Sequence, residues 1–146
     1  STVAKAFTEV EERAGKSIGI VPTVDYDGSL VPREQYPNPY IEVPIITPLD
    51  KKTVKAANPY SRNYVNVMTS HGLIVLPGEQ GTRDEVSLGL KFNKPMILFG
   101  PDSAFKTFPE QPTRMDDISV VREFLEHVSA RFRTELEERE NEYEQH

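Results

Sequence analysis

The segment from residue 72 to residue 100 constrains the fold of this chain more than any other. Two apolar runs without polar alternation, residues 73–76 and 96–99, are separated by Pro77-Gly78 and a stretch of helical pattern. Continuous apolar runs are typical of strands buried on both faces of a sheet, and parallel strands require a crossover connection that is usually helical. The segment therefore predicts a βαβ unit, with residues 73–76 as a central strand.

The rest of the chain alternates between helical and strand patterns. Apolar residues recur at helical spacing in residues 2–14, which Gly15 would end, and a short buried strand follows at residues 17–21. The other expected elements are a strand at 41–47, where Pro44 lacks a ladder donor and argues for an edge position or a bulge, and a helix at 56–71 that carries Arg62. This order predicts the α/β class, as a three-layer Rossmann-like parallel sheet flanked by helices.

A long amphipathic helix is expected near the C-terminus, with Asp116 and Asp117 as its caps. Beyond its apolar stripe, the pattern fades into an acidic end that we interpret as solvated or frayed and as favouring solubility rather than docking. The stripe, which we expect to pack on the sheet through Phe132, consists of Ile118, Val121, Leu125, Val128 and Phe132.

Residues 22–40 are expected to form a long loop, because they contain four prolines and an Asp27-Gly28 turn. The start of this turn resembles a calcium loop, but the later ligands are absent at the required spacing, so an ordinary turn is expected. Five of the six tyrosines lie between residues 26 and 64. Tyrosine-lined loops can stack on a nucleobase, and packing at the loop rim is the alternative.

Length and charge limit the classes of function. A chain of 146 residues fits one domain, which we expect at residues 1–133, followed by an acidic helix end or tail at 134–146. The tail holds six Glu and one Arg, so the first 133 residues carry only about −1 of the net charge of −6. Neither part offers a basic face for duplex nucleic acid.

Composition and residue spacing argue against a membrane span, a disulfide framework and a metal site. No apolar run is long enough to span a membrane. The absence of cysteine rules out disulfides and thiolate metal sites and fits a reducing compartment, so a cytoplasmic location is expected. His71, His127 and His146 show no ligand spacing, so no metal site is expected.

The junction after residues 73–76 has the composition of an anion cradle. Gly78 and Gly81 permit positive φ and a close approach of the backbone to a ligand. The first N–H groups of the following helix supply donors, and the helix dipole adds a positive partial charge. The predicted anion site consists of Gly78, Glu79, Gln80, Gly81 and Thr82.

Glu85 has two interpretations. Thr82 and Glu85 have the spacing of a capping box, in which the threonine hydroxyl accepts a hydrogen bond from the Glu85 N–H and the carboxylate reaches back. The alternative is a carboxylate that binds a ribose or takes part in catalysis. Asp84 points roughly 100° around the helix, so we assign it to dipole compensation in the first turn.

The nine residues from Pro77 to Glu85, Pro-Gly-Glu-Gln-Gly-Thr-Arg-Asp-Glu, resemble the Pro-Gly-Gly-x-Gly-Thr-x-x-Glu signature of the LOG (Lonely Guy) proteins. These are cytokinin-activating phosphoribohydrolases, often mislabelled lysine decarboxylases. They belong to a wider superfamily of Rossmann-like nucleotide-binding proteins that includes molybdenum-cofactor carrier proteins. The likeness covers about residues 1–130 and extends to Arg62 and to the segments 16–22, 73–76 and 94–98.

The resemblance implies an enzyme that cleaves the N-glycosidic bond of nucleoside 5′-monophosphates. It assigns Glu85 as the catalytic carboxylate and Arg62 as its charged partner, and it places the 5′-phosphate at the helix N-terminus. A carboxylate beside the ribose would stabilise an oxocarbenium-like state or activate water. The expected ligand is a nucleoside monophosphate, and no other cofactor is implied.

The chain departs from the family pattern in two ways. Glu79 replaces the second glycine of the signature, and at ~5 Å with an effective dielectric of ~20 its repulsion from a phosphate charge would be about 3 kcal/mol. We expect Arg83 to offset part of that repulsion. The family's first β-α-β elements are also missing, so another chain or segment is expected to complete the cleft. Apolar surface exposed in this way favours a homo-oligomer.

The sequence therefore leaves two functions open. One is a nucleotide-binding Rossmann-like protein, with or without phosphoribohydrolase activity. The other is a non-catalytic cofactor carrier or a regulatory or oligomerisation subunit with the same fold, which Glu79 and the missing elements favour. The expected partner is a small-molecule nucleotide, and we expect the protein to be a homo-oligomer.

Overall fold

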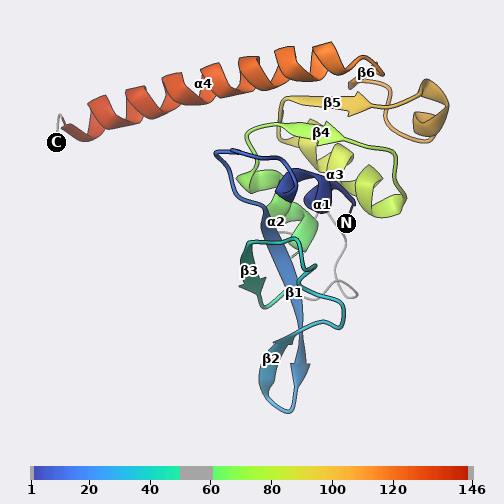
Figure 1. The fold of residues 1–146 in the computed structure, drawn as a ribbon, viewed down its shortest axis with the longest axis vertical. Coiled ribbons are helices and arrows are strands. Elements are labelled where there is room, and N and C mark those ends of the chain that lie inside the picture. The colour runs from blue at the N-terminus through green and yellow to red at the C-terminus, as the bar shows by residue number, and fades with distance from the viewer. Residues whose placement is uncertain (1, 50–60, 145–146) are drawn as a thin grey trace. The chain divides into compact units, whose positions relative to one another are not determined.

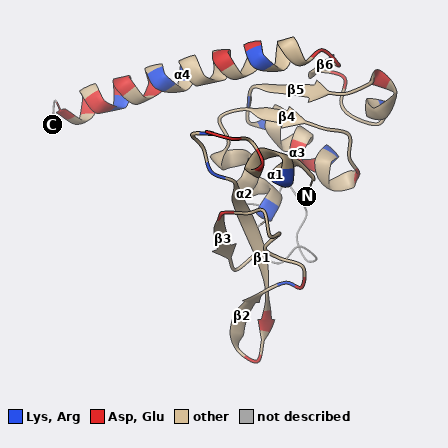
Figure 2. Ribbon diagram, in the orientation of Figure 1, with Lys and Arg blue, Asp and Glu red and all other residues tan. Residues whose placement is uncertain are grey.

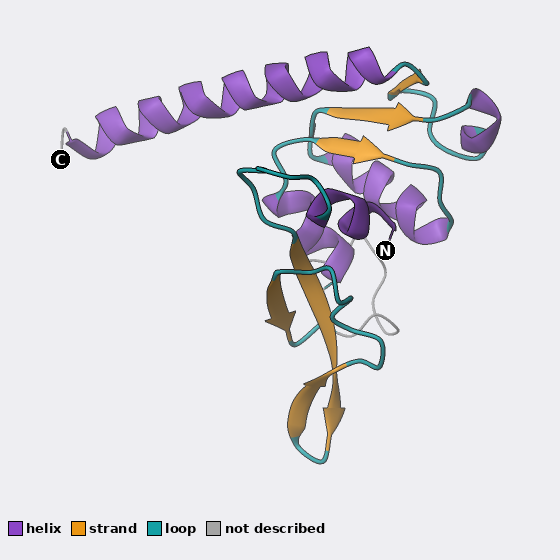
Figure 3. Cartoon of the chain, viewed as in Figure 1, coloured by secondary structure: helices purple, strands orange, loops and turns teal. Residues whose placement is uncertain are grey.

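The computed structural model describes residues 2–49 and 61–144, and the chain divides into two compact units, Ser1–Asn66 and Val67–His146 (Figure 1). The strands form two three-stranded sheets, in the orders β2-β1-β3 and β4-β5-β6, and helices accompany them (Figure 3). The predicted α/β class is confirmed. The second sheet is parallel and flanked by helices, an arrangement compatible with a Rossmann-like fold.

Within its described residues, the first unit contains the short helix α1 (Thr2–Thr8), the beginning of α2 (Arg62–Thr69) and a mixed sheet. The helix α1 ends at Thr8, well before Gly15 and contrary to the prediction, and the φ of 55° at Glu12 is incompatible with a helix that continues to Gly15. The strands of this sheet are β1 (Ile18–Tyr26), β2 (Ser29–Pro32) and β3 (Val43–Thr47).

A β-hairpin replaces most of the long loop predicted at residues 22–40. Asp27 and Gly28 have φ values of 53° and 76°, as a type I′ turn requires, and this turn makes β2 antiparallel to β1. The Gly28 N–H donates to Asp25 Oδ1 at 3.0 Å, so the carboxylate that resembled a calcium ligand serves the turn. The predicted turn is therefore confirmed, whereas the loop on either side of it is strand as far as Pro32.

β1 and β3 pair in parallel through both backbone and side chains. Thr23 Oγ1 donates to the Thr47 carbonyl at 2.7 Å, and Thr47 Oγ1 donates to the Val21 carbonyl at 3.0 Å. β3 lies at the edge of its sheet, which confirms the position predicted from Pro44.

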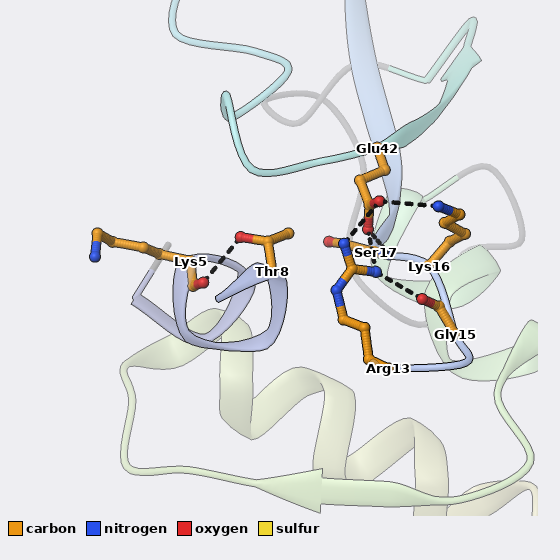
Figure 4. A network of polar contacts seen from close by, with 7 residues as sticks. All are labelled: Lys5, Thr8, Arg13, Gly15, Lys16, Ser17 and Glu42. Carbon is orange, nitrogen blue, oxygen red and sulfur yellow. Dashed lines mark hydrogen bonds and ion pairs between the residues drawn. The ribbon is translucent and has the colours of Figure 1, made fainter. Parts of the chain in front are cut away.

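A polar cluster joins the beginnings of β1 and β3 (Figure 4). Glu42 accepts from Arg13 Nη2 at 2.9 Å and from the Ser17 N–H at 2.9 Å, and its other ion pairs are with Arg13 Nη1 at 2.8 Å and Lys16 at 3.4 Å. The hydrogen bonds from Arg13 and then Ser17 are the main causes that lower the pKa of Glu42 from 4.5 to about 2. This carboxylate therefore holds residues distant in sequence at the start of the sheet.

The second unit contains the predicted βαβ segment. β4 (Leu73–Val75), α3 (Gln80–Lys91) and β5 (Met96–Phe99) follow one another, and β4 pairs in parallel with β5. The prediction of β4 as a central strand is wrong among the described strands, because β5 lies between β4 and β6 and Ile74 is 39% exposed. The remaining elements are α2 (Arg62–Thr69), which spans the boundary between the units, η1 (Asp102–Phe105), β6 (Thr113–Met115) and α4 (Ile118–Glu144).

The core of the second unit lies between the sheet and α3. Gly89 permits the close packing of α3 on the strands, since a Cβ at this position would lie 2.8 Å from Leu73 Cδ1. The rings of Phe105 and Phe108 close this core in an edge-to-face contact with centroids 5.2 Å apart. The buried core residues are Val75, Val86, Leu98, Phe105 and Phe108.

α4 is a single helix that continues to Glu144, so its acidic end is helical rather than frayed. The Ser119 N–H donates to Asp117 Oδ1 at 2.9 Å, which confirms Asp117 as a cap and lowers the pKa of that carboxyl. The predicted stripe packs only in part: Val121 is buried and Phe132 contacts the His71 ring, but Leu125 is 48% exposed. None of the helices in the described ranges is long and apolar enough to cross a membrane.

Candidate functional site

The predicted anion site lies at the carboxyl edge of the parallel sheet, where β4 leads into α3. The N–H groups of Thr82 and Arg83 donate to the Glu79 carbonyl at 3.1 and 3.2 Å, which are the first bonds of the helix. The N–H groups of Gln80 and Gly81 precede these bonds. They stand at the positive end of the helix dipole, so this terminus has the chemistry of an anion site.

The two glycines of the junction differ in what they permit. Gly78 allows a close approach within the chain, because a Cβ at this position would lie 2.9 Å from Thr82 Cβ. A Cβ at Gly81 would meet no atom of the described chain within 4 Å. Neither residue is among those with positive φ, so the conformational freedom that these glycines permit is not used here, and the expected approach of their backbone to a ligand stays a prediction.

The predicted capping box does not form. α3 begins at Gln80 with Glu79 as its N-cap, so Thr82 already lies inside the first turn and its side chain lies beside Gly78. Glu85 consequently stands beyond the first turn and is half-buried, and Asp84 is likewise too late to compensate the dipole there. Glu79 itself makes no side-chain capping bond. The glycine at position 78 explains the early start, because it lets Thr82 approach the incoming backbone.

A hydrogen-bonded chain of side chains covers one side of the first turn of α3. Arg83 Nη2 donates to Gln80 Oε1 at 3.0 Å, and Gln80 Nε2 donates to Asp84 Oδ1 at 2.8 Å. Arg83 also donates to Thr107 Oγ1 at 3.3 Å. The ion pairs found within residues 2–49 and 61–144 do not join Arg83 to Glu79, so the expected compensation of the Glu79 charge is not made by direct pairing.

Arg62 lies in the first unit and lines a cavity there of about 470 Å³. Its Cζ lies 5.9 Å from the centroid of the Tyr36 ring, and its Nη2 donates to Asn63 Oδ1 at 3.4 Å. Its Nε is buried and has no hydrogen-bond partner in the part of the chain that the structure describes. Asn38 and Asn66 add amide groups to the same cavity wall.

This cavity was only partly foreseen from the sequence. The tyrosine-rich segment suggested stacking on a nucleobase, and Tyr36 is the tyrosine that reaches the cavity beside Arg62. Gln35, with a φ of 70°, and Asn38 were not predicted as lining residues. The sequence around Gln35 and Asn38 is rich in turn residues between β2 and β3. Such a composition predicts an irregular loop, but it does not predict that the loop lines a cavity beside Arg62.

The structure assigns Arg62 to the first unit and Glu85 to the second, so their pairing stays a prediction. Within the described residues there is no group of three or more His, Cys, Asp or Glu side chains that could hold a metal ion. The arrangement therefore offers two sets of groups: a helix N-terminus for an anion, and a cavity with an arginine and an aromatic ring.

The model of the SLOG cluster4 family matches residues 2–126. SLOG proteins include LOG-like, Rossmann-like proteins, so the broader resemblance is confirmed, although the match is not to the LOG family itself. Neither the curated proteins nor the solved structures contain a match to this chain.

Proposed function

The chain belongs to the SLOG cluster4 family, and from this premise we propose that it binds a nucleotide at the carboxyl edge of the β4-β5-β6 sheet. Family membership suggests a nucleotide-related function for a Rossmann-like protein. The observation that carries the proposal is the start of α3 directly after β4, with the Gln80 and Gly81 N–H groups ahead of the first helical bond. Ligands of open α/β sheets bind at such strand-to-helix junctions.

Gly81 supports this proposal independently of the helix dipole. Glycine within a helix costs about 1 kcal/mol relative to alanine, so a helical glycine usually has a steric reason. No described atom lies where its Cβ would be, so packing within the described chain does not supply that reason. A phosphate lying against the Gly81 backbone would supply it.

Calorimetric titration tests the role of the phosphate. A nucleoside 5′-monophosphate should bind at least about tenfold more tightly than the matching nucleoside, since tenfold corresponds to ~1.4 kcal/mol. Glu79→Gln should tighten binding of the monophosphate about three- to tenfold at low salt, because it removes a negative charge beside the phosphate. Glu123→Gln, which removes an exposed charge from α4, is the matched control. Equal binding of nucleoside and nucleotide would contradict the proposal.

The finer proposal is hydrolysis of the N-glycosidic bond. Glu85 is not a helix cap, and it follows Gly81 by four residues, so both lie on the same face of α3. From that face its carboxylate could stabilise positive charge on a ribose whose phosphate lies at Gly81, or accept a proton from attacking water. Arg62 is assigned as the charged partner on the strength of the family resemblance alone.

Release of the free base from nucleoside 5′-monophosphates, followed by chromatography, tests this step. We expect wild-type turnover and a loss of at least about 100-fold in Glu85→Gln, with unchanged nucleotide affinity, since general acid–base groups contribute typically ~10²–10⁴-fold. Binding without turnover in the wild type would instead favour the non-catalytic carrier or regulatory function. The observation that favours this second function is the Glu79 charge, which has no direct ion pair with Arg83 to offset it.

A further inference from the structure

One side of α4 exposes an apolar stripe that the second unit does not cover. Ile118 is 69% exposed, Leu125 48%, Leu136 38% and Tyr143 86%. These four residues, which we call the outer stripe, are separated by seven, eleven and seven positions. At 3.6 residues per turn these separations are about two, three and two turns, so the four side chains project from the same side of the helix.

The outer stripe borders the side of α4 that packs on its own unit and lies about 20–80° away from it around the helix. That inner side includes Val121, which is buried, Val128, whose methyl groups lie where a Cβ of Gly72 would be, and Phe132 against His71. The hollow beside the first two turns of α4 is lined by residues of α4 alone, Ile118 and Leu125 among them. The helix thus carries more apolar surface than its own unit buries.

The spacing within the outer stripe is the same when read from either end. We propose that α4 pairs antiparallel with α4 of a second copy of this chain. Antiparallel pairing centred near Ala130 would place Ile118 opposite Tyr143 of the second copy and Leu125 opposite its Leu136. The same patch then serves both copies, as a two-fold symmetric interface requires.

The charges of α4 favour the antiparallel direction. Residues 118–133 contain three Arg and two Glu, whereas residues 134–144 contain six Glu and one Arg. Acidic residues therefore gather toward the C-terminal end of the helix (Figure 2). Antiparallel pairing sets each acidic end beside the more basic half of the other helix, with Arg122 facing Glu140, whereas parallel pairing would bring the two acidic ends together.

Sedimentation of the full chain tests the pairing. Four side chains from each copy make a small interface, so a dimer that dissociates in the micromolar range is expected. Leu125→Glu should weaken dimerisation at least tenfold. Ala130→Glu adds the same charge at an exposed position roughly 140° around the helix and should leave dimerisation unchanged. A wild-type chain that is monomeric at several hundred micromolar would overturn the proposal.

Charge reversal tests whether Arg122 of one copy lies opposite Glu140 of the other. Arg122→Glu alone should weaken the dimer, and adding Glu140→Arg should restore it, because the reversed charges still face each other. Restoration separates an interhelical pair from a general effect of charge on solubility. A double variant as weak as the single variant would contradict the proposed register.

Cysteine cross-linking tests the direction, and the chain has no cysteine of its own. Leu125→Cys chains mixed with Leu136→Cys chains should form a disulfide-linked dimer under mild oxidation. Either variant alone should not, because an eleven-residue offset separates like positions by about 16 Å, beyond the ~7 Å Cα limit of a disulfide. Cross-linking of Leu125→Cys with itself would instead indicate parallel helices and reject the antiparallel arrangement.

Discussion

The Thr82 side chain occupies the space beside the Gly78 backbone, so that a Cβ at position 78 would lie 2.9 Å from Thr82 Cβ. This contact lies where β4 ends and α3 begins. Because Thr82 Cβ is fixed by the helix backbone, a change of rotamer cannot relieve the clash. The first glycine of the signature, Gly78, is therefore required by packing within the chain itself.

Gly78→Ala should destabilise the protein by about 1–3 kcal/mol, the usual cost of overpacking. Thr82→Ala in the same chain removes the hydroxyl and methyl groups but keeps the Cβ, so the double variant should recover part of the loss. Urea unfolding of the two single variants and the double variant measures this coupling. Additive effects would show that the two residues do not meet.

Gly81→Ala should have the opposite effect on stability. Its Cβ would meet no described atom, and replacing a helical glycine with alanine gains about 0.5–1 kcal/mol. If a phosphate approaches the Gly81 backbone, the same change should weaken nucleotide binding several-fold. Thermal unfolding with and without a nucleoside 5′-monophosphate measures both effects, and a gain in stability with unchanged affinity would place the ligand elsewhere.

The sequence predicted the second unit better than the site within it. The runs around Leu73 and Met96 specify β4 and β5 because burial of continuous apolar segments is a local signal. The start of α3 was misplaced because Thr82 and Glu85 match a capping box in type and spacing. The helix can begin earlier because Gly78 has no side chain that would clash with Thr82. This contact exists only in the folded structure, so a local sequence pattern does not show it.

The first unit was harder to predict because its signals conflict. Pro22 argues against a strand interior, yet it lies within β1 and is fully buried, while the Asp27-Gly28 pair marks the hairpin that extends β1. The cavity beside Arg62 could not be predicted, because Tyr36 and Arg62 are distant in sequence and meet only through the fold. Local sequence patterns do not predict contacts between residues that are distant in sequence.

The Glu42 cluster predicts a pH dependence for the first unit. Folding lowers the pKa of Glu42 from 4.5 to about 2, so its contribution is fully present above about pH 5 and is lost as the pH falls toward 2. In Glu42→Gln this part of the pH dependence should disappear, and stability near pH 7 should be lower than in the wild type. Glu11→Gln, an exposed neighbour, is the control.

Hydrogen exchange locates the effect of Glu42. The Val43 N–H donates to the Ser17 carbonyl at 3.0 Å beside the cluster, so its protection should fall in Glu42→Gln. Protection of the Leu98 N–H in the second unit should change less. An equal loss of protection at Val43 and Leu98 would mean that the two units unfold together. It would contradict a local effect of Glu42 on its own sheet.

Gly89 predicts a packing limit between α3 and the sheet. A Cβ at this position would lie 2.8 Å from Leu73 Cδ1 and would also meet Met96 Cε. Both atoms are side-chain ends, and the flexible methionine can move, so Gly89→Ala should cost only about 1–2 kcal/mol after the gain in helix propensity. Gly89→Val should cost more, because a branched side chain cannot be accommodated in the same way.

Combining Gly89→Ala with Met96→Leu should recover part of the loss if Met96 is the main obstacle. Denaturant unfolding of the three variants distinguishes this contact from a general intolerance of larger residues in α3, in which case the second change would bring no recovery.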